Sequence, residues 1–330
     1  MRYLTANDIK KVFSMKDAIE ASKEALSLYS TGKADIPLRT NIDIPEHDGQ
    51  SLYMPGYVSG SQSALGIKIV SVFPRNSIRG LPNVPATMVT LNAETGVVNA
   101  ILDGTFLTQL RTGAIQGLAT ELLSLQNSKQ ALLIGTGGQA MFQLEAMLTV
   151  RHLQKVFIFD VDSSKAQAFT EKATDIFQKV FSSEFISVNN PNDVLKNVDI
   201  ITSVTTSRQP TFDGNLIKRG THVNGIGAYT PKMCELPLGL LQKADCIIFD
   251  TMDGVLAEAG DIIQPIRRGK LSKDKFTGEL GKLINKKITG RSNNDQITVF
   301  KSVGTAALDV IVADRIVRAA QKKNIGTLLS

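Results

Sequence analysis

The segment Ala131-Leu132-Leu133-Ile134-Gly135-Thr136-Gly137-Gly138-Gln139-Ala140 decides the fold that we expect for this chain. Its first residues form an apolar run without polar alternation, which is typical of a buried parallel strand. In the turn that follows, Gly135 permits a tight bend, Gly137 lets the backbone approach a pyrophosphate, and Ala140 allows strand and helix to pack closely. Amide groups at the start of the next helix, residues 141–148, would hold the phosphate charge. The segment therefore predicts a dinucleotide-binding turn.

An acidic residue stands where such a turn needs one. A second apolar strand, Val156-Phe157-Ile158-Phe159, ends at Asp160, about twenty residues after the glycine turn, where an acid binds the ribose diol. A carboxylate there would repel a 2′-phosphate, so we expect NAD(H), with use of NADP(H) left open. Asp162 is a second candidate for the cofactor site, although it more naturally caps the helix that starts near Ser163. Capping of that helix is also the alternative role for Asp160.

Strands and helices alternate after the glycine turn. We expect helices at residues 163–177 and 191–196, and strands near 186–188 and at 199–204, 221–226 and 246–250. This alternation indicates a parallel, doubly wound sheet. The expected fold class is therefore α/β, with a Rossmann dinucleotide-binding domain at residues 126–304.

The first third of the chain has the pattern of an α+β domain. After a helix at 14–30, segments 36–44 and 51–55 suggest a hairpin, and 66–73, 88–91 and 97–102 are further, largely antiparallel strands. Further helices are expected at 105–125 and at 305–320. Because the last helix can pack back on the first domain, we expect a discontinuous domain of residues 1–125 and 305–330.

Composition argues against several classes of protein. With 42% apolar and 21% charged residues over 330 positions, the chain is globular and large enough for two domains. No apolar run is long enough to cross a bilayer and the start lacks a signal-peptide core, so no membrane partner is expected. Cys234 and Cys246 show no metal spacing, so we expect no metal site and a reducing, cytoplasmic location. The net charge of +6 lacks interleaved aromatic residues, which argues against a nucleic-acid partner.

Three basic residues stand in settings where a structural role is hard to supply. Lys68 lies inside an apolar strand, Arg39 begins a strand, and Arg111 lies in a helix of small residues. Near a nicotinamide, guanidinium groups would grip a substrate carboxylate in a fork while an ammonium polarises or protonates the reacting centre. The alternative is an ordinary surface position, and for Lys68 the polar face of a one-sided sheet.

Several motifs along nearly the whole chain match a known family. The most specific combination is Leu110-Arg111-Thr112 followed by the glycine turn at this spacing. Supporting motifs are Gly66-Ile67-Lys68 and the segments 80–84, 92–96 and 298–304. On these residues the chain resembles the ornithine cyclodeaminase/mu-crystallin family.

The resemblance implies a homodimer with a discontinuous substrate and dimerisation domain beside a Rossmann domain. Arg39, Lys68 and Arg111 match family positions that hold the substrate carboxylate, and Lys68, near the reacting carbon, is the candidate catalytic residue. The family pattern also supports Asp160 as the ribose ligand. The remaining positions that match the cofactor site are Asn83, Arg111, Thr112, the turn from Gly135 through Thr136, Gly137, Gly138 and Gln139 to Ala140, and, more weakly, Thr205, Val303 and Gly304.

One departure from the family pattern bears on the activity. Members that cyclise ornithine carry an aspartate in the loop that corresponds to Gly227-Ala228-Tyr229-Thr230-Pro231, where it activates water or the amino group. Tyr229 stands at that position here, and a phenol with an ordinary pKa of about 10 is a poor base at neutral pH. Another acidic residue could substitute, but the departure argues against ornithine cyclodeamination. Tyr229 remains a candidate substrate-binding residue.

We therefore expect an NAD(P)H-dependent reductase that converts an imino acid, such as Δ1-pyrroline-2-carboxylate or a related ketimine, to the amino acid. Reducing a preformed imine needs no base to activate water, which fits the missing aspartate. The alternatives are ornithine cyclodeaminase, alanine dehydrogenase or an opine-type amino-acid dehydrogenase, and a nucleotide-dependent binding protein with little turnover. The expected partners are a small amino or imino acid and a second copy of the chain.

Overall fold

The structure is a computed structural model that describes residues 1–329 and separates into two compact units. The first unit comprises Met1–Arg111 and Thr305–Ser330, and the second comprises Thr112–Gly304. The internal boundary lies within helix α3 (Gly104–Leu123), whereas we expected it at residue 125, just after that helix. Polar residues indicate where a helix ends. They do not indicate at which residue a continuous helix passes from one compact unit to the other.

An eight-stranded sheet forms the first unit, in the order β16-β1-β7-β6-β5-β4-β2, with β3 paired to β4. The strands from β2 to β7 pair antiparallel and include the expected hairpin of β3 and β4. β1 lies parallel to β7 and antiparallel to β16; the sequence pattern did not predict these two short strands. The bounds are β1 Arg2–Leu4, β2 Ala34–Asp35, β3 Thr40–Ile44, β4 Gly49–Val58, β5 Ala64–Val72, β6 Ala86–Leu91, β7 Val98–Asp103 and β16 Thr327–Leu328.

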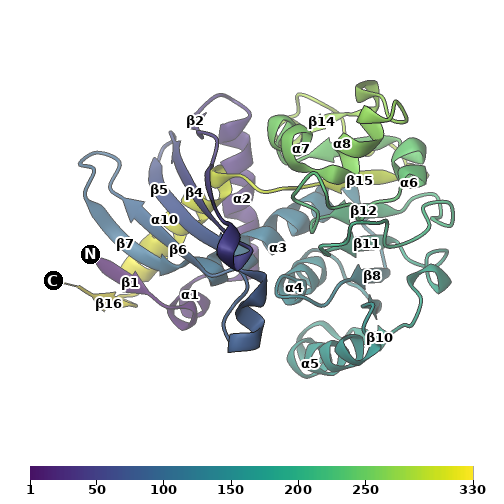
Figure 1. The fold of residues 1–330 in the computed structure, drawn as a ribbon, viewed down its shortest axis with the longest axis horizontal. Helices are drawn as coiled ribbons and strands as arrows, with labels where there is room; N and C mark the ends of the chain where they lie inside the picture. The colour runs from purple at the N-terminus through teal and green to yellow at the C-terminus, as the bar shows by residue number, and fades with distance from the viewer. Residues whose placement is uncertain (330) are drawn as a thin grey trace. The chain divides into compact units, whose positions relative to one another are not determined.

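Helix α10 (Ala306–Lys322) lies against one face of this sheet, where it contacts β4, β5, β6 and helix α2 (Met15–Tyr29) (Figure 1). Helix α1 (Ala6–Val12) and helix α2 each begin with a capping box, formed by Thr5 with Asp8 and by Ser14 with Asp17. Such boxes satisfy backbone donors that have no partner within the helix. The closing helix therefore packs on the first unit.

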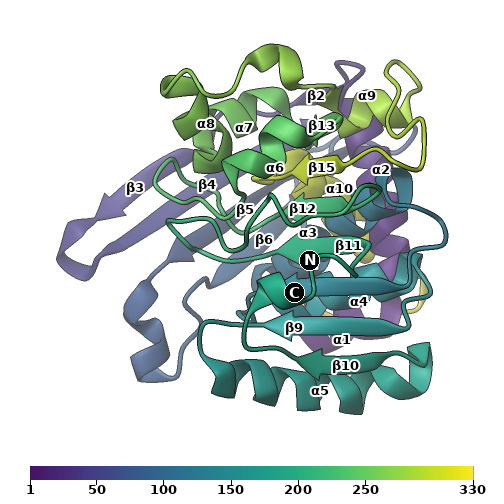
Figure 2. The ribbon, with the colours of Figure 1, turned by 90° about the vertical axis from the view of Figure 1, so that its right-hand side faces the viewer.

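The second unit is built on an eight-stranded sheet in the order β10-β9-β8-β11-β12-β15-β13-β14 (Figure 2). Every neighbouring pair in this order is parallel, which confirms the α/β class and the parallel sheet. The bounds are β8 Gln130–Ile134, β9 Lys155–Phe159, β10 Glu184–Ser187, β11 Ile200–Ser203, β12 His222–Gly225, β13 Cys246–Phe249, β14 Gly278–Glu279 and β15 Thr298–Lys301. The direction of strand addition reverses between β8 and β11, and ligands of such sheets bind beyond the carboxyl ends of the strands at this point.

Two details of the second unit differ from the sequence-based expectation. β15, a strand that the sequence pattern did not predict, lies between β12 and β13. The helix expected at 191–196 is wrong: Pro191–Asp193 forms a short 3₁₀ turn, because the N–H groups of Val194 and Asn197 bond to carbonyl oxygens three residues back. The helices are α4 Ala140–Val150, α5 Ser163–Phe181, α6 Leu238–Lys243, α7 Met252–Glu258, α8 Gly260–Arg267 and α9 Leu280–Ile284.

Among residues 1–329, no helix combines the length and apolar character needed to span a bilayer. Over the same residues, the structure brings no group of three or more His, Cys, Asp or Glu side chains into an arrangement suited to a metal ion.

Candidate functional site

Lys68 lies in the middle of β5 on the face of the sheet that α10 covers, and its side chain is 1% exposed. Its partners across the strands are Met54 on β4 and Met88 on β6, both buried. Ile67 and Ile69, which alternate with Lys68, are only half-buried. The alternative in which Lys68 faces solvent is therefore wrong, because the strand places its isoleucines, and not its lysine, on the more exposed face.

Asp309 on α10 is the partner of two of the predicted cations. The Lys68 ammonium donates to Asp309 Oδ2 at 2.7 Å, and Arg111 Nε donates to Asp309 Oδ1 at 2.9 Å. Asp309 is fully buried and Arg111 nearly so. Both carboxylate oxygens are engaged, so α10 fixes Lys68 and Arg111 relative to each other. Removing one partner of such a buried cluster leaves an uncompensated charge, at a penalty of about 3–5 kcal/mol.

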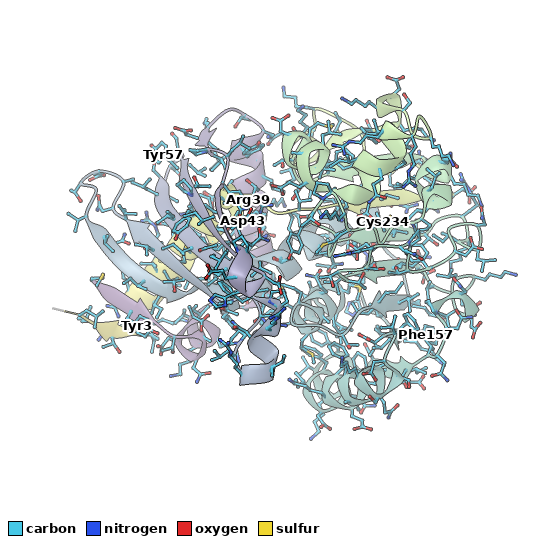
Figure 3. The ribbon with its side chains drawn as sticks, viewed as in Figure 1. Tyr3, Arg39, Asp43, Tyr57, Phe157 and Cys234 are labelled. Atoms are coloured by element: carbon cyan, nitrogen blue, oxygen red, sulfur yellow. The ribbon has the colours of Figure 1, made fainter. Side chains whose placement is uncertain are left out.

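The buried cluster of Lys68, Arg111 and Asp309 carries an excess of positive charge. Burial lowers the pKa of Lys68 to about 8, Asp309 opposes this effect, and the nearby charges of Arg111 and Arg39 add to it. Arg39 lies in the segment that connects β2 to β3 and is half-buried; Figure 3 labels it. Among the residues that the structure describes, Asp309 thus pairs with two buried cations, Lys68 and Arg111, and a substrate carboxylate is the kind of group that would balance the second charge.

Asn83 lies in the loop before β6 and contacts the end of β5 through its backbone. Its carbonyl oxygen accepts the N–H of Phe73 at 2.9 Å, which ties the loop before β6 to the end of β5. The residue itself is exposed.

In the second unit, the chain bends at Gly135, directly after β8. Gly135 has a φ of +97°, and a Cβ there would lie 2.9 Å from the Thr205 side chain and from the Val204 carbonyl oxygen. A Cβ on Gly137 would meet no atom within 4 Å, so there is open space where a pyrophosphate would approach the backbone. Gln139, the residue before α4, makes no side-chain cap, and its buried Oε1 has no hydrogen-bond partner among the described residues.

Asp160 and Asp162 have different tasks. Asp160 Oδ2 accepts the backbone N–H and the hydroxyl of Thr136, at 2.9 and 2.7 Å, and Oδ1 accepts the N–H of Asp162. Although partial burial acts in the opposite direction, these bonds lower the pKa of Asp160 below its usual value. Asp162 caps α5 by accepting from the backbone of Ser164 and Lys165. Asp160 is thus tied to the glycine turn, and the capping alternative for it is wrong.

These features fit a dinucleotide. Open space at Gly137 meets the steric requirement of the pyrophosphate, and the start of α4 supplies backbone donors without intrahelical partners. The ionised Asp160 stands at the end of β9, next to the strand that leads into the turn, where it can accept hydrogen bonds from ribose hydroxyl groups.

Three other predicted cofactor residues, Thr205, Val303 and Gly304, lie on loops that buried carboxylates hold in place. Asp250 Oδ2 accepts the N–H groups of Val303 and Gly304 at 3.0 and 2.7 Å, and the Ser302 hydroxyl. Thr205, just after β11, donates its N–H to Glu235 Oε2 at 2.9 Å.

Two further predicted residues also belong to the second unit. Tyr229 is half-buried in the loop after β12. Thr112 is buried on α3 as the first residue of this unit. The predicted site residues therefore divide between the two units, and each unit supplies its own set.

Comparison with known proteins identifies the family. The sequence profile of the ornithine cyclodeaminase/mu-crystallin family matches residues 2–324. The chain belongs to this family. It is 33% identical to a Δ1-pyrroline-2-carboxylate reductase of Bacillus cereus, over 99% of this chain and 98% of that protein. It is equally 33% identical to an alanine dehydrogenase of Archaeoglobus fulgidus, over 98% of this chain and 96% of that one.

A solved structure of a relative shares the fold of this chain. The Δ1-pyrroline-2-carboxylate reductase of Thermococcus litoralis, solved in complex with NADH and L-proline, superposes with a TM-score of 0.94. The two chains are 36% identical, and the match covers all of both. The expected family and fold class are therefore confirmed.

Sequence reasoning missed the acidic partners of the site. Asp309, Glu235 and Asp250 are buried carboxylates that hold predicted site residues, yet none was singled out. Asp309 had a signal in the sequence, because it is the one charged residue in the otherwise apolar segment 306–313. The sequence gives a weaker indication that Glu235 and Asp250 are buried. Both lie in loops, where an acidic residue is ordinarily exposed to solvent.

Proposed function

We propose that this protein is an NADH-dependent imino-acid reductase that converts Δ1-pyrroline-2-carboxylate, or a related ketimine, to the amino acid. The observation that carries the proposal is the buried cluster of Lys68, Arg111 and Asp309, whose positive charges exceed its negative charge. Similarity to Δ1-pyrroline-2-carboxylate reductases over nearly the whole chain supports the same substrate class.

Arg111 and Arg39 hold the substrate carboxylate in this proposal. Asp309 engages Nε of Arg111, which fixes the plane of the guanidinium and directs its Nη groups to the carboxylate fork. Arg39 adds a second cation from the segment before β3. A planar, always charged guanidinium is suited to this task because it meets both carboxylate oxygens at once.

Lys68 acts at the reacting end of the substrate. The reaction adds a hydride to the imine carbon and a proton to the imine nitrogen, and bound NADH supplies the hydride. The Lys68 ammonium stabilises the charge of the bound substrate or passes a proton through water to the nitrogen, and its lowered pKa makes proton transfer easier than for an ordinary lysine. Tyr229 fits this chemistry, because no base is needed to activate water.

The coenzyme site of the proposal lies in the second unit. The turn from Gly135 to Ala140 receives the pyrophosphate, and Asp160 binds the adenosine ribose, which favours NADH over NADPH. Further contacts to the coenzyme from this unit are assigned to Thr112, Thr205, Val303 and Gly304. The solved relative that contains NADH supports NAD(H) as the coenzyme.

A homodimer is a further part of the proposal, supported by the uncovered face of the first sheet. The strand register aligns Pro55, Ile67, Val89, Ile101 and Tyr3 in one row across β4, β5, β6, β7 and β1. All these side chains are partly or well exposed in the single chain, and Tyr3 and Tyr57 are labelled on the same sheet in Figure 3. A continuous apolar row of this kind is typical of a protein–protein interface, and its match is a second copy of the same face.

The cytoplasm remains the proposed location. Cys234 and Cys246 are both free thiols in the structure. A chain with unpaired cysteines is suited to a reducing compartment.

Alanine dehydrogenase is the second candidate function, because one relative of equal identity carries that activity in its name. It uses the same cations, since pyruvate and its imine also carry a carboxylate next to the reacting carbon. The two activities differ in the size of the carbon skeleton and in the need for free ammonia.

The discriminating experiment measures NADH oxidation by the purified full chain with Δ1-pyrroline-2-carboxylate, with pyruvate plus ammonia, and with no second substrate. The proposal expects rapid oxidation with the cyclic imine and a loss of about a hundredfold or more in Lys68→Ala. Faster oxidation with pyruvate plus ammonia would favour alanine dehydrogenase. Ammonia release from ornithine without net NADH oxidation would overturn both reductive functions.

A further inference from the structure

Glu235 is a fully buried carboxylate that the proposed reaction does not use directly. Its Oε2 accepts the Ser203 hydroxyl and the Thr205 N–H, both at 2.9 Å. Its Oε1 accepts the N–H groups of Gly227 and Ala228, at 2.6 and 3.0 Å. One side chain therefore bonds the loop after β11 and the loop after β12 at the same time.

The two loops that Glu235 joins are packed tightly on each other and on the glycine turn. A Cβ on Gly227 would lie 2.1 Å from the Thr205 carbonyl oxygen, so the loops touch through their backbones. A Cβ on Gly135 would lie 2.9 Å from Thr205 Cγ2. Thr205 thus stands between the glycine turn and the Tyr229 loop, at the edge of the sheet where the coenzyme is proposed to bind.

The charge of Glu235 is balanced by a buried lysine. Lys301, the last residue of β15, places Nζ 3.5 Å from Glu235 Oε1 and 2.8 Å from Asp261 Oδ2, and all three side chains are buried. Asp261 Oδ1 in turn accepts the N–H groups of Glu235 and Leu236. Burial raises the pKa of Glu235 and Asp261 raises it further, while Lys301 opposes both effects.

We propose that Glu235 is a positioning residue for the coenzyme: its ionised carboxylate, with Lys301 as counterion, holds the loops after β11 and β12 in the arrangement that binds NADH. The proposal rests on the proposed function of this edge as the coenzyme site. Ionisation is required because only a carboxylate offers acceptors on both oxygens. An amide or a protonated acid turns a donor toward at least one backbone N–H, which then loses its partner.

The test measures the dissociation constant of NADH for the full chain, by the change in coenzyme fluorescence. Glu235→Gln is expected to weaken NADH binding about tenfold or more, because a buried donor is left unsatisfied. The matched control is Asp199→Asn. Asp199 also accepts two backbone N–H groups, of Lys129 and Gln130, and also pairs with a lysine, Lys218, but it lies where β8 and β11 begin, at the opposite edge of the sheet. Its variant is expected to bind NADH as the wild type does.

A pH series separates positioning from general stability. The groups that face Glu235 are Lys301, Asp261, Asp250 near Lys301, and the Cys234 thiol labelled in Figure 3, whose pKa burial raises to about 12. Lys301→Met removes the favourable counterion, so Glu235 takes up a proton at higher pH, and the loss of NADH affinity on acidification is expected to move to higher pH. The double variant Lys301→Met with Glu235→Gln is expected to lack this shift, which assigns it to Glu235 and not to Asp261.

The outcomes distinguish this proposal from the proposed function. If the wild type does not bind NADH, the coenzyme site itself is wrong. If the wild type binds NADH and Glu235→Gln binds it equally well, or if Asp199→Asn loses as much affinity, the positioning role of Glu235 is overturned. Should Glu235→Gln not fold, Lys301→Met retains the carboxylate and decides the question: an unshifted pH dependence contradicts the proposal.

Discussion

The ammonium of Lys68 lies 2.7 Å from a carboxylate oxygen of Asp309, although the two residues are 241 positions apart in the chain. The closing helix that carries Asp309 returns to the first unit and covers the strand that carries Lys68. The same carboxylate engages Arg111. The discontinuity of the first unit therefore serves the site, because it places a buried anion between the cations that are proposed to meet the substrate.

Asp309→Asn tests how much this contact contributes to the free energy of unfolding. An amide cannot balance the buried charges of Lys68 and Arg111, so the free energy of unfolding is expected to fall by about 3 kcal/mol or more. Urea denaturation measures the change. The control is Asp314→Asn on the same helix, which breaks the more exposed pairs with Arg315 and Arg318 and is expected to lower stability by about 1 kcal/mol or less. Equal effects of the two substitutions would contradict the account.

The pKa of Lys68 sets a pH dependence for substrate binding. Burial lowers this pKa to about 8, so the ammonium is charged below that pH and loses its proton as the pH rises through it. kcat/KM for the imino acid is therefore expected to fall on the alkaline side with a midpoint of about 8. Lys68→Arg, which stays charged, is expected to lack the transition. In Asp309→Asn, the midpoint is expected at lower pH, because the charge that raises the pKa of Lys68 is gone. An unchanged midpoint in both variants would assign the transition to another group.

Asp160 is expected to set the coenzyme preference. Its carboxylate accepts hydrogen bonds at the glycine turn, and its charge repels a 2′-phosphate. Asp160→Ser is expected to reduce the preference for NADH over NADPH by about tenfold or more, measured as the ratio of the two kcat/KM values. Asp162→Ser is the matched control, because Asp162 caps α5 and the serine can still cap. A preference that follows Asp162 and not Asp160 would contradict the assignment.

Tyr229→Phe is expected to keep imine reduction within about threefold of the wild-type rate, because general acid–base catalysis, which contributes about a hundredfold or more, is not assigned to this phenol. Steady-state NADH oxidation measures the rate. A loss of two orders of magnitude or more in kcat, with an unchanged dissociation constant for NADH, would instead show that the Tyr229 hydroxyl takes part in proton transfer.

The uncovered face of the first sheet is expected to hold the dimer together. Val89→Asp places a charge in the centre of the row formed with Ile67 and Ile101. Sedimentation velocity is expected to show a monomer for this variant and a dimer for the wild type, since a buried unpaired charge is strongly unfavourable. Val180→Asp, an exposed position on α5, is expected to leave the dimer intact. A monomeric wild type would contradict the proposal.

Local sequence patterns account for much of the second unit. The apolar run before Gly135, the glycine turn and the acid at the end of the next strand follow one another within about thirty residues, so their geometry is set by short-range constraints. The parallel pairing of β8 with β9 lies within the same stretch. β15 was not predicted, because its place between β12 and β13 depends on which strands are already neighbours and not on the segment itself.

The first-unit site shows where sequence patterns stop being informative. Lys68 alternates with isoleucines, a pattern that allows either face of the sheet to be the buried one. Only the position of α10, brought back from the far end of the chain, decides that Lys68 is buried, and only Asp309 makes that burial tolerable. Glu235 escaped prediction for a related reason, since three of the groups that donate to it are backbone N–H groups, which leave no mark on the residue types.

The most direct test of the central claim follows the hydride itself. The full chain is incubated with Δ1-pyrroline-2-carboxylate and NADH that carries deuterium at the transferable position, and the proline formed is analysed by mass spectrometry. The account predicts one deuterium on the α-carbon of proline and one NADH consumed for each proline. Proline without deuterium, or NADH left unconsumed while the wild type binds it, would contradict imine reduction as the function of this protein.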